Sequence, residues 1–183
     1  MVNLACFLEE QSAKVFLEGL LPRILPNETI VQYVVFEGKQ DLEKRLLSKL
    51  KNWQKPDTVF LVMRDQDSSV CGTLKKKLAE ICANAGRPNT LVRIACHELE
   101  SFYFGDLLSV ERALQLQIGS KKQARYRVPD DIVRPSEELI RVTKGAYQKI
   151  GSSREIGKII SLDDNTSTSF NNLISGIRRI VSA

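Results

Sequence analysis

Hydrophobic and polar positions alternate in a regular order through the first hundred residues of the chain. Short apolar runs rich in β-branched residues predict strands, and apolar residues spaced three and four apart predict amphipathic helices between them. The runs are apolar throughout, which is typical of parallel strands buried on both faces. The predicted strands span residues 2–8, 29–36, 58–63 and 90–96, and the predicted helices span 12–24, 41–53 and 69–85.

Strands that alternate with helices in this way predict one fold class. Parallel strands joined by helical crossovers form a Rossmann-like α/β sheet, here four-stranded and mainly parallel, with helices on both faces. Beyond Asp106 the pattern changes to helices with polar links around a basic, irregular stretch. These helices are expected at 107–118, 136–147, 152–160 and 169–181, and the basic stretch at 119–135. We therefore expect an α/β domain over residues 1–106 and a basic α-helical extension over 107–183 that packs on it.

Composition is typical of an ordinary globular protein. The chain has 183 residues, of which 43% are hydrophobic and 27% are charged, and this length allows one sizeable core. No apolar run reaches the length of about 18 residues that a membrane span needs, and the N-terminal residues lack the pattern of a secretory signal. Four cysteines without a CxxC pair, with His97 as the only histidine, argue against a structural zinc site. We expect a cytoplasmic protein without membrane contact.

Charge is unevenly distributed along the chain. Residues 1–111 carry 14 lysines and arginines against 15 acids, whereas residues 112–183 carry 13 against 7, and the net charge of the whole chain is +5. A basic second part suits a partner rich in phosphate, such as nucleic acid. A solvated helical surface would show the same excess, so charge by itself leaves both interpretations open.

Acidic side chains follow three of the four predicted strands. Because parallel strands end at one edge of a sheet, we expect these acids to converge there. Two carboxylates about 4 Å apart repel by on the order of 4 kcal/mol at an effective dielectric near 20, unless a proton, a basic group or a cation intervenes. Oxygen ligands of this kind select Mg²⁺ or Mn²⁺. The acids are Glu9 and Glu10 after the first strand, Asp65 and Asp67 after the third, and Glu98 and Glu100 after the fourth.

The two aspartates after the third strand are the most suggestive pair. Side chains alternate along a strand, so Asp65 and Asp67 are expected to point the same way and to share a cation. Plainer roles exist for both. Asp67 fits the N-cap of the helix that follows, and Arg64 fits an ordinary ion pair with a neighbouring aspartate.

The remaining candidates also have plainer explanations. Glu10 and Glu100 fit the first turn of a helix, where a negative charge is favourable. Lys39 follows a glycine at the end of the second strand and fits either a solvated turn or a phosphate contact. His97 and Glu98 form half of a zinc-protease HExxH motif, but the second histidine is missing, so that interpretation is rejected.

Four segments, in order, resemble the Toprim fold. They are FLEEQSAKVFLEGLLPRIL, FEGKQDL, FLVMRDQDSSVC and RIACHELESFYFGD. A glutamate after the first strand and a DxD pair after the third are the signature of that fold, which type IA and II topoisomerases, bacterial primases and nucleases of the overcoming-lysogenization-defect (OLD) type share. With KGAYQKIGSSREIGKII and NTSTSFNNLISGI nearer the C-terminus, nearly the whole chain is similar to a bacterial Toprim-like family of unknown function related to OLD nucleases.

The resemblance implies a role for each acid. Glu9 matches the Toprim glutamate, which assists acid–base chemistry or metal binding, and Asp65 and Asp67 match the metal-binding DxD pair. Glu98 and Glu100 match further acids of the resembling family and would complete a site for one or two Mg²⁺ or Mn²⁺ ions. One departure is that a second glutamate stands where a glycine commonly follows the Toprim glutamate.

The implied function is a metal-dependent nuclease that hydrolyses phosphodiester bonds with a metal-activated water. Lys39 would stabilise charge that develops on the phosphate. No tyrosine is evidently placed as a topoisomerase nucleophile, which disfavours strand transfer. The flanking backbone of the nucleic acid would be held, without sequence preference, by Lys121, Lys122, Arg125 and Arg127.

Two further interpretations concern partners. Toprim nucleases often act with ATPases in phage defence or DNA repair, and the absence of a Walker A segment from this sequence favours a separately encoded ATPase as partner. The alternative is a catalytically inactive Toprim module that binds nucleic acid or a partner protein; acids after three strands favour catalysis. A phosphoacceptor receiver domain is disfavoured, because neither a hydroxyl residue after the fourth strand nor a fifth strand is visible.

Overall fold

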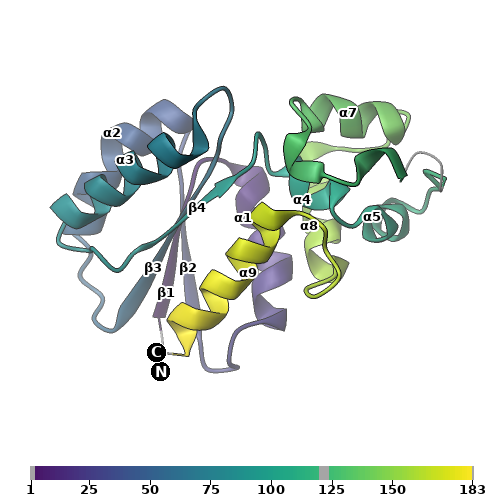
Figure 1. Ribbon diagram of the computed structural model, residues 1–183. Helices are drawn as coiled ribbons and strands as arrows, with labels where there is room; N and C mark the ends of the chain where they lie inside the picture. The colour runs from purple at the N-terminus through teal and green to yellow at the C-terminus, as the bar shows by residue number, and fades with distance from the viewer. Residues whose placement is uncertain (1–2, 120–123, 183) are drawn as a thin grey trace.

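Four parallel strands form a single sheet in the order β2-β1-β3-β4 (Figure 1). The structure is a computed structural model that describes residues 3–119 and 124–182. The strands are β1 (Asn3–Leu8), β2 (Ile30–Val35), β3 (Thr58–Asp65) and β4 (Leu91–Ala95). The predicted fold class, a four-stranded parallel α/β sheet with helices on both faces, is confirmed.

Helices cover both faces of this sheet, and the alternation of side chains along each strand decides which face a residue serves. The first three helices are α1 (Gln11–Leu20), α2 (Lys39–Lys51) and α3 (Cys71–Asn84). Phe7 and Val62 point to the face under α2 and α3, whereas Leu8 and Met63 point to the opposite face, under α1. The helix predicted over 12–24 ends at Leu20 and continues as a 3₁₀ turn, η1 (Leu21–Arg23), that contains Pro22.

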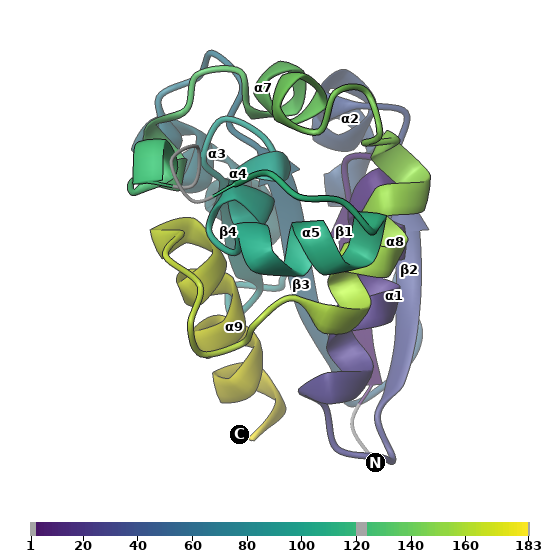
Figure 2. The ribbon, with the colours of Figure 1, turned by 90° about the vertical axis from the view of Figure 1, so that its right-hand side faces the viewer.

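The C-terminal helices share one hydrophobic core with the α1 face of the sheet. Buried residues of this core come from β1 and α1 and also from the segments after residue 106, among them Leu139, Ile156 and Phe170. The elements of this part are α4 (Glu100–Phe104), α5 (Leu107–Leu114), η2 (Ala124–Tyr126), η3 (Pro129–Asp131), α7 (Pro135–Val142), α8 (Lys149–Ile159) and α9 (Thr168–Val181). α9 lies against β3 and β4, and α8 lies beside α1 (Figure 2).

Two predicted helices of the C-terminal part are shorter than expected. The helix predicted over 107–118 ends at Leu114, where Gln115 takes the left-handed conformation with φ 52°. The helix predicted over 136–147 ends at Val142, and Lys144 is left-handed two residues later, with φ 54°. Apolar periodicity continues past both ends, but a left-handed residue cannot continue a right-handed helix.

Glycines allow α1 and α8 to approach closely. A Cβ on Gly157 of α8 would lie 2.3 Å from the carbonyl oxygen of Phe16, and one on Gly19 of α1 would lie 2.8 Å from the backbone nitrogen of Lys158. At the other end of the same pair of helices, Lys149 of α8 contacts Glu10, the N-cap residue of α1. The two helices are therefore parallel, and both begin at the edge of the sheet where the acids were predicted.

We predict that Gly157→Ala destabilises the protein because its methyl group would overlap backbone atoms of α1. The expected loss in the free energy of unfolding is about 1–3 kcal/mol, measured by urea unfolding. Gly151→Ala is the matched control, since Gly151 lies in the same helix with nothing within 4 Å of its added Cβ. This control should stabilise the protein by roughly 0.5–1 kcal/mol. Equal effects of the two substitutions would contradict the close contact.

Candidate functional site

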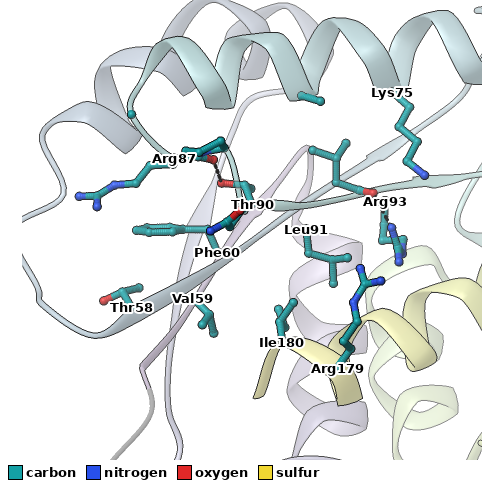
Figure 3. Close-up of a pocket in the computed structure, with 15 residues that line it drawn as sticks. Thr58, Val59, Phe60, Lys75, Arg87, Thr90, Leu91, Arg93, Arg179 and Ile180 are labelled. Atoms are coloured by element: carbon teal, nitrogen blue, oxygen red, sulfur yellow. Dashed lines mark hydrogen bonds between the residues drawn. The ribbon is translucent and has the colours of Figure 1, made fainter. Parts of the chain in front are cut away.

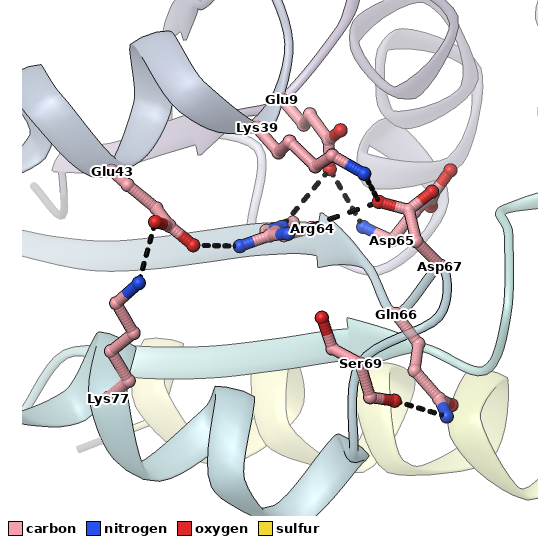
Figure 4. Close-up of polar contacts among 9 residues, drawn as sticks. All are labelled: Glu9, Lys39, Glu43, Arg64, Asp65, Gln66, Asp67, Ser69 and Lys77. Carbon is pink, nitrogen blue, oxygen red and sulfur yellow. Dashed lines mark hydrogen bonds and ion pairs between the residues drawn. The ribbon is translucent and has the colours of Figure 1, made fainter.

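The carboxyl ends of β1 and β3 lie side by side where the strand order reverses. Leu8 at the end of β1 is in register with Met63 of β3, so the residues that follow them meet. The backbone N–H of Asp65 donates a hydrogen bond of 3.1 Å to the Oε2 atom of Glu9 (Figure 4). The structure thus brings Glu9 and Asp65 together at the edge where ligands bind in doubly wound sheets.

Successive residues at the end of β3 point to opposite faces of the sheet and serve two different groups. Arg64 continues the face of Val62, toward α2 and α3, and Asp65 continues the face of Met63, toward α1 and the C-terminal helices. The acids at this edge consequently fall into two adjoining sets. One set surrounds Arg64 and the other surrounds Asp65.

Arg64 is the buried centre of the first set, with only 3% of its side chain exposed. Its Nε atom lies 3.6 Å from Oε2 of Glu9, its Nη2 atom lies 3.9 Å from Oδ2 of Asp67, and its Nη1 atom forms a short ion pair with Glu43. Glu43 also accepts a hydrogen bond of 2.6 Å from Lys77 (Figure 4). The ion pair that the sequence suggested for Arg64 is therefore a network that reaches α2 and α3. Burial raises the pKa of Glu43, but the hydrogen bonds and charges of Lys77 and Arg64 outweigh burial and lower this pKa below its usual value.

Asp67 does not lie on the same face as Asp65, contrary to our expectation. β3 ends at Asp65, and Asp67 is in a left-handed turn with φ 52°, so strand alternation does not extend to it. The backbone N–H of Asp67 donates to the carbonyl of His97 at 2.8 Å, and its carboxylate accepts from Nζ of Lys39 at 3.1 Å. Asp67 is not a helix N-cap either, because α3 begins at Cys71 with Val70 in the N-cap position.

The second set gathers three glutamates and a lysine around Asp65. Burial is the main reason why the pKa of Asp65 is raised well above its usual range, and the charges of Glu100, Glu10 and Glu9 raise it further, whereas Lys149 lowers it. Lys149 forms an ion pair of 2.8 Å with Glu10. No side chain in the described part of the chain donates a hydrogen bond to the Asp65 carboxylate.

Glu100 is fully buried beneath this set. Its Oε1 atom accepts a hydrogen bond of 2.7 Å from the hydroxyl of Tyr147, and its Oε2 atom has no partner among the described residues. Burial raises the pKa of Glu100, while the Tyr147 hydroxyl and Lys149 lower it. A buried carboxylate oxygen without a partner is costly, so Glu100 is the acid of this set whose hydrogen-bonding capacity is least satisfied.

Glu98 is oriented away from this group. Its carboxylate accepts a hydrogen bond of 2.8 Å from the backbone N–H of Ser136, in the first turn of α7. Glu98 therefore satisfies a helix N-terminus, and as a metal ligand it would have to give up that bond.

The predicted nucleic-acid contacts are placed in part. Arg125 and Arg127 are exposed in and just after η2, which is anchored by Tyr126 against Phe104. Lys121 and Lys122 lie outside the described residues.

The donor set fits a hard cation in chemistry but is not assembled for one. Glu9, Asp65 and Glu100 supply carboxylate oxygens, the ligands that Mg²⁺ and Mn²⁺ prefer. Across residues 3–119 and 124–182, however, no three His, Cys, Asp or Glu side chains are close enough to hold an ion as they stand. Arg64, Lys39 and Lys149 instead act as internal counterions for the acids. A cation would have to displace at least one of these contacts.

Sequence patterns missed Glu43 and Lys149 as members of this site. Lys149 is 139 positions from Glu10 in the chain, so no local spacing relates the two. Glu43 is one of several charged residues on α2, and the sequence does not show that this residue, and not a neighbour, contacts Arg64. Glu10, the N-cap residue of α1, acts electrostatically on both Glu9 and Asp65.

Comparison with solved structures identifies the class of fold. The chain is similar to the C-terminal region of the Burkholderia pseudomallei OLD protein, with 15% identity, a TM-score of 0.52 and coverage of 97% of this chain and 98% of that chain. It is also similar to the C-terminal region of the Xanthomonas campestris pv. campestris OLD protein, with 12% identity, a TM-score of 0.50 and coverage of 98% and 95%. The expected Toprim-like, OLD-related fold is thereby confirmed, and identities this low establish the fold alone.

The family follows from the sequence. A model of the domain of unknown function DUF4276 matches residues 8–178, and the chain belongs to that family. No functionally curated protein matches it. Among the described residues, no helix has both the length and the apolar character that crossing a membrane requires.

We predict that Arg64→Ala is strongly destabilising, because it leaves Glu9 and Glu43 without their buried counterion. The expected loss in the free energy of unfolding is roughly 3 kcal/mol, measured by urea unfolding. Adding Glu43→Gln to the variant should recover part of the loss, whereas additive losses would show that the two residues do not act as a pair. The control is Arg45→Ala, which breaks an exposed pair with Asp41 on α2 and should cost less than about 0.5 kcal/mol.

A second prediction concerns the pH dependence of stability. The pKa of Glu100 is raised on folding, so the folded protein holds this proton more tightly than the unfolded chain does. Its contribution is thus present below the unfolded pKa of about 4 and is lost as pH rises toward the folded pKa. Glu100→Gln keeps an acceptor for Tyr147 and cannot ionise, so it should be more stable than wild type near about pH 8 and lose this advantage near about pH 5.

Thermal unfolding across this pH range measures the difference between the two proteins. Glu18→Gln, on the exposed face of α1, is the control and should follow the wild-type profile. Parallel profiles for wild type and Glu100→Gln would contradict a buried acid that resists ionisation.

Proposed function

We propose that the protein is a nuclease that uses Mg²⁺ or Mn²⁺ to hydrolyse phosphodiester bonds in nucleic acid. One observation carries the proposal. Carboxylates that follow β1 and β4 surround Asp65 at the end of β3, and an oxygen of the fully buried Glu100 has no partner among the described residues. A fold keeps such a group of like charges at a cost, and perturbed acids of this kind are typical of functional sites.

The proposed ligands are the acids nearest to Asp65. Asp65, Glu9 and Glu100 would hold the first ion. Glu10 would supply the further carboxylate that the sequence analysis expected from Asp67. Asp67 would join a second position after release from Lys39, and Glu98 after release from the first turn of α7. A bound ion of this kind polarises the phosphate and lowers the pKa of the attacking water.

Cations of the chain would bind the substrate. Lys149 and Lys39 lie at the two sides of the acid group, each paired with one of its carboxylates. With those carboxylates bound to a metal ion, both ammonium groups would be free to contact the phosphate and to stabilise the charge that develops during hydrolysis. Arg125 and Arg127, with Lys121 and Lys122, would hold the flanking backbone in a salt-dependent manner.

Partners belong to the same proposal. The solved structures that this chain resembles are the C-terminal regions of OLD proteins, and residues 1–183 contain no Walker A segment. We propose a separately encoded ATPase as its partner, in phage defence or DNA repair, with both proteins in the cytoplasm.

A second function is supported by a separate observation. Arg64, Lys39 and Lys149 already neutralise most of the acid group internally. A module that binds nucleic acid or a partner protein without catalysis would have this arrangement, since it needs no cation to offset the acids.

Asp65→Asn discriminates between the two functions. We expect purified wild-type protein to cleave plasmid or single-stranded DNA, or RNA, with Mn²⁺ or Mg²⁺, and Asp65→Asn to lower the rate by roughly 100-fold or more. Mn²⁺ should also raise the melting temperature of the wild type and not that of the variant, because only the wild type binds the ion.

The control is Asp163→Asn, which changes an acid whose side chain is 78% exposed and which is paired with Arg178. It should cleave and respond to Mn²⁺ as the wild type does. Absence of both cleavage and a metal-dependent shift in wild type would reject the nuclease and support the binding module.

A further inference from the structure

A groove runs along the outer edge of β4, away from the acid site. A hollow of about 830 Å³ follows the first part of the strand, between α3 and α9 (Figure 3). A second hollow of about 210 Å³ shares Lys75, Val92 and Arg93 with the first and continues toward the end of the strand. We call these two hollows together the β4 groove.

The floor of the β4 groove is an open edge of the sheet. β4 is the last strand in the sheet order, and it pairs with β3 on one side only. The carbonyl of Ala95 faces β3, where it accepts from Gln66, so the alternate residues Val92 and Ile94 present their backbone groups outward. The carbonyl of Val92 accepts a hydrogen bond of 2.9 Å from Nη1 of Arg93. The outward backbone groups of Ile94 form no hydrogen bond with any residue in the described ranges. An added strand would satisfy this edge.

The walls of the groove are basic. Lys75 from α3, Arg93 from β4 and Arg179 from α9 point toward the same space (Figure 3). None of the three forms an ion pair within residues 3–119 and 124–182, and burial together with the charge of Arg179 lowers the pKa of Arg93. A fourth cation, Arg87, is engaged with the ring of Phe60 at 5.1 Å.

One acid lines the far end of the groove, but it is already engaged. Asp130 accepts hydrogen bonds from the N–H and hydroxyl of Ser169 and from the hydroxyl of Ser167. Asp130 forms no ion pair with Lys75, Arg93 or Arg179 among the described residues, and one carboxylate against these three cations leaves the groove with a net positive charge.

We propose that the β4 groove binds an acidic, extended segment of a partner protein, which adds to the sheet as a fifth strand. Such a segment would pair its backbone with the edge of β4 and place carboxylates against Lys75, Arg93 and Arg179. It would also cover the partly buried side chain of Ile180, part of the apolar lining. This interaction is independent of phosphodiester hydrolysis at the acid site.

The lining distinguishes this occupant from two others. A second copy of the chain that paired through its own β4 edge would bring the same three cations against each other, which charge repulsion disfavours. A nucleic-acid strand would satisfy the cations, but its phosphates cannot pair with the outward carbonyl of Ile94 or cover the apolar lining. An acidic strand satisfies all three features.

Fluorescence polarisation of the full chain with labelled peptides tests the proposal. The probe is a peptide of roughly eight residues in which glutamate alternates with threonine, because this pattern fixes which face of an added strand carries the charges. We expect it to bind, and we expect a peptide with lysine in place of glutamate not to bind. Lys75→Glu with Arg179→Glu should weaken binding at least about tenfold. Both side chains are exposed, so the double variant should fold.

The matched control variant is Lys76→Glu with Arg178→Glu, which changes net charge equally at neighbouring exposed positions outside the groove. It should bind the peptide nearly as wild type does. Backbone pairing is tested with two peptides that are N-methylated at alternate positions, because only one set of N–H groups faces β4. One of these peptides should lose binding and the other should keep it.

Three results would overturn the proposal. They are no binding of the acidic peptide, equal binding of both N-methylated peptides, or equal weakening by the groove and control variants. Binding of an oligothymidylate that depends on Lys75 and Arg179, without peptide binding, would assign the groove to nucleic acid. A dimer in solution that the groove variant dissociates would assign it to a second copy.

Discussion

The adjacency of β1 and β3 is the constraint on which the rest of the structure depends. Parallel pairing of these strands places Glu9 and Asp65 at one edge. Glu10 follows Glu9 in the chain, and α4, which follows β4, adds Glu100. Carboxylates about 4 Å apart repel by on the order of 4 kcal/mol at an effective dielectric near 20. The fold offsets this repulsion from both faces of the sheet. Arg64 does so on the face toward α2, and Lys149 does so on the face toward α1.

The internal counterions determine how the acid group can respond to ligands. Each of Arg64, Lys39 and Lys149 contacts at least one carboxylate that a metal ion would also require. Binding of the proposed cation would therefore require release of Lys39 and Lys149 from their carboxylates. The lysines are exposed enough to move, with about half of each side chain accessible at 48% and 47%, whereas Arg64 is buried and stays in place. Arg64 therefore holds the buried side of the acid group in place, whereas Lys39 and Lys149 on its exposed side can move.

Most of the fold could be predicted from the sequence, because the local spacing of apolar residues indicates each strand and most of the helices. The carboxyl ends of parallel strands lie at one edge, so the meeting of Glu9 with Asp65 also followed from order alone. The position of Asp67 did not, since a left-handed turn ends the alternation just before it. Lys149 was inaccessible to local reasoning for a different reason: its neighbour Glu10 is distant in sequence, and only the close packing of α1 and α8 joins them.

The placement of α9 has a consequence for how the chain acquires its structure. Leu4 of β1 and Leu173 of α9 belong to one core, although they lie near opposite ends of the sequence. β1 is synthesised well before α9, the helix that shields β3 and β4. Contacts of such long range slow folding, because the entropy of closing a large loop must be overcome first. Until α9 is synthesised, one face of the nascent sheet would remain uncovered. Chaperones that recognise apolar surfaces would be able to bind this face during that time.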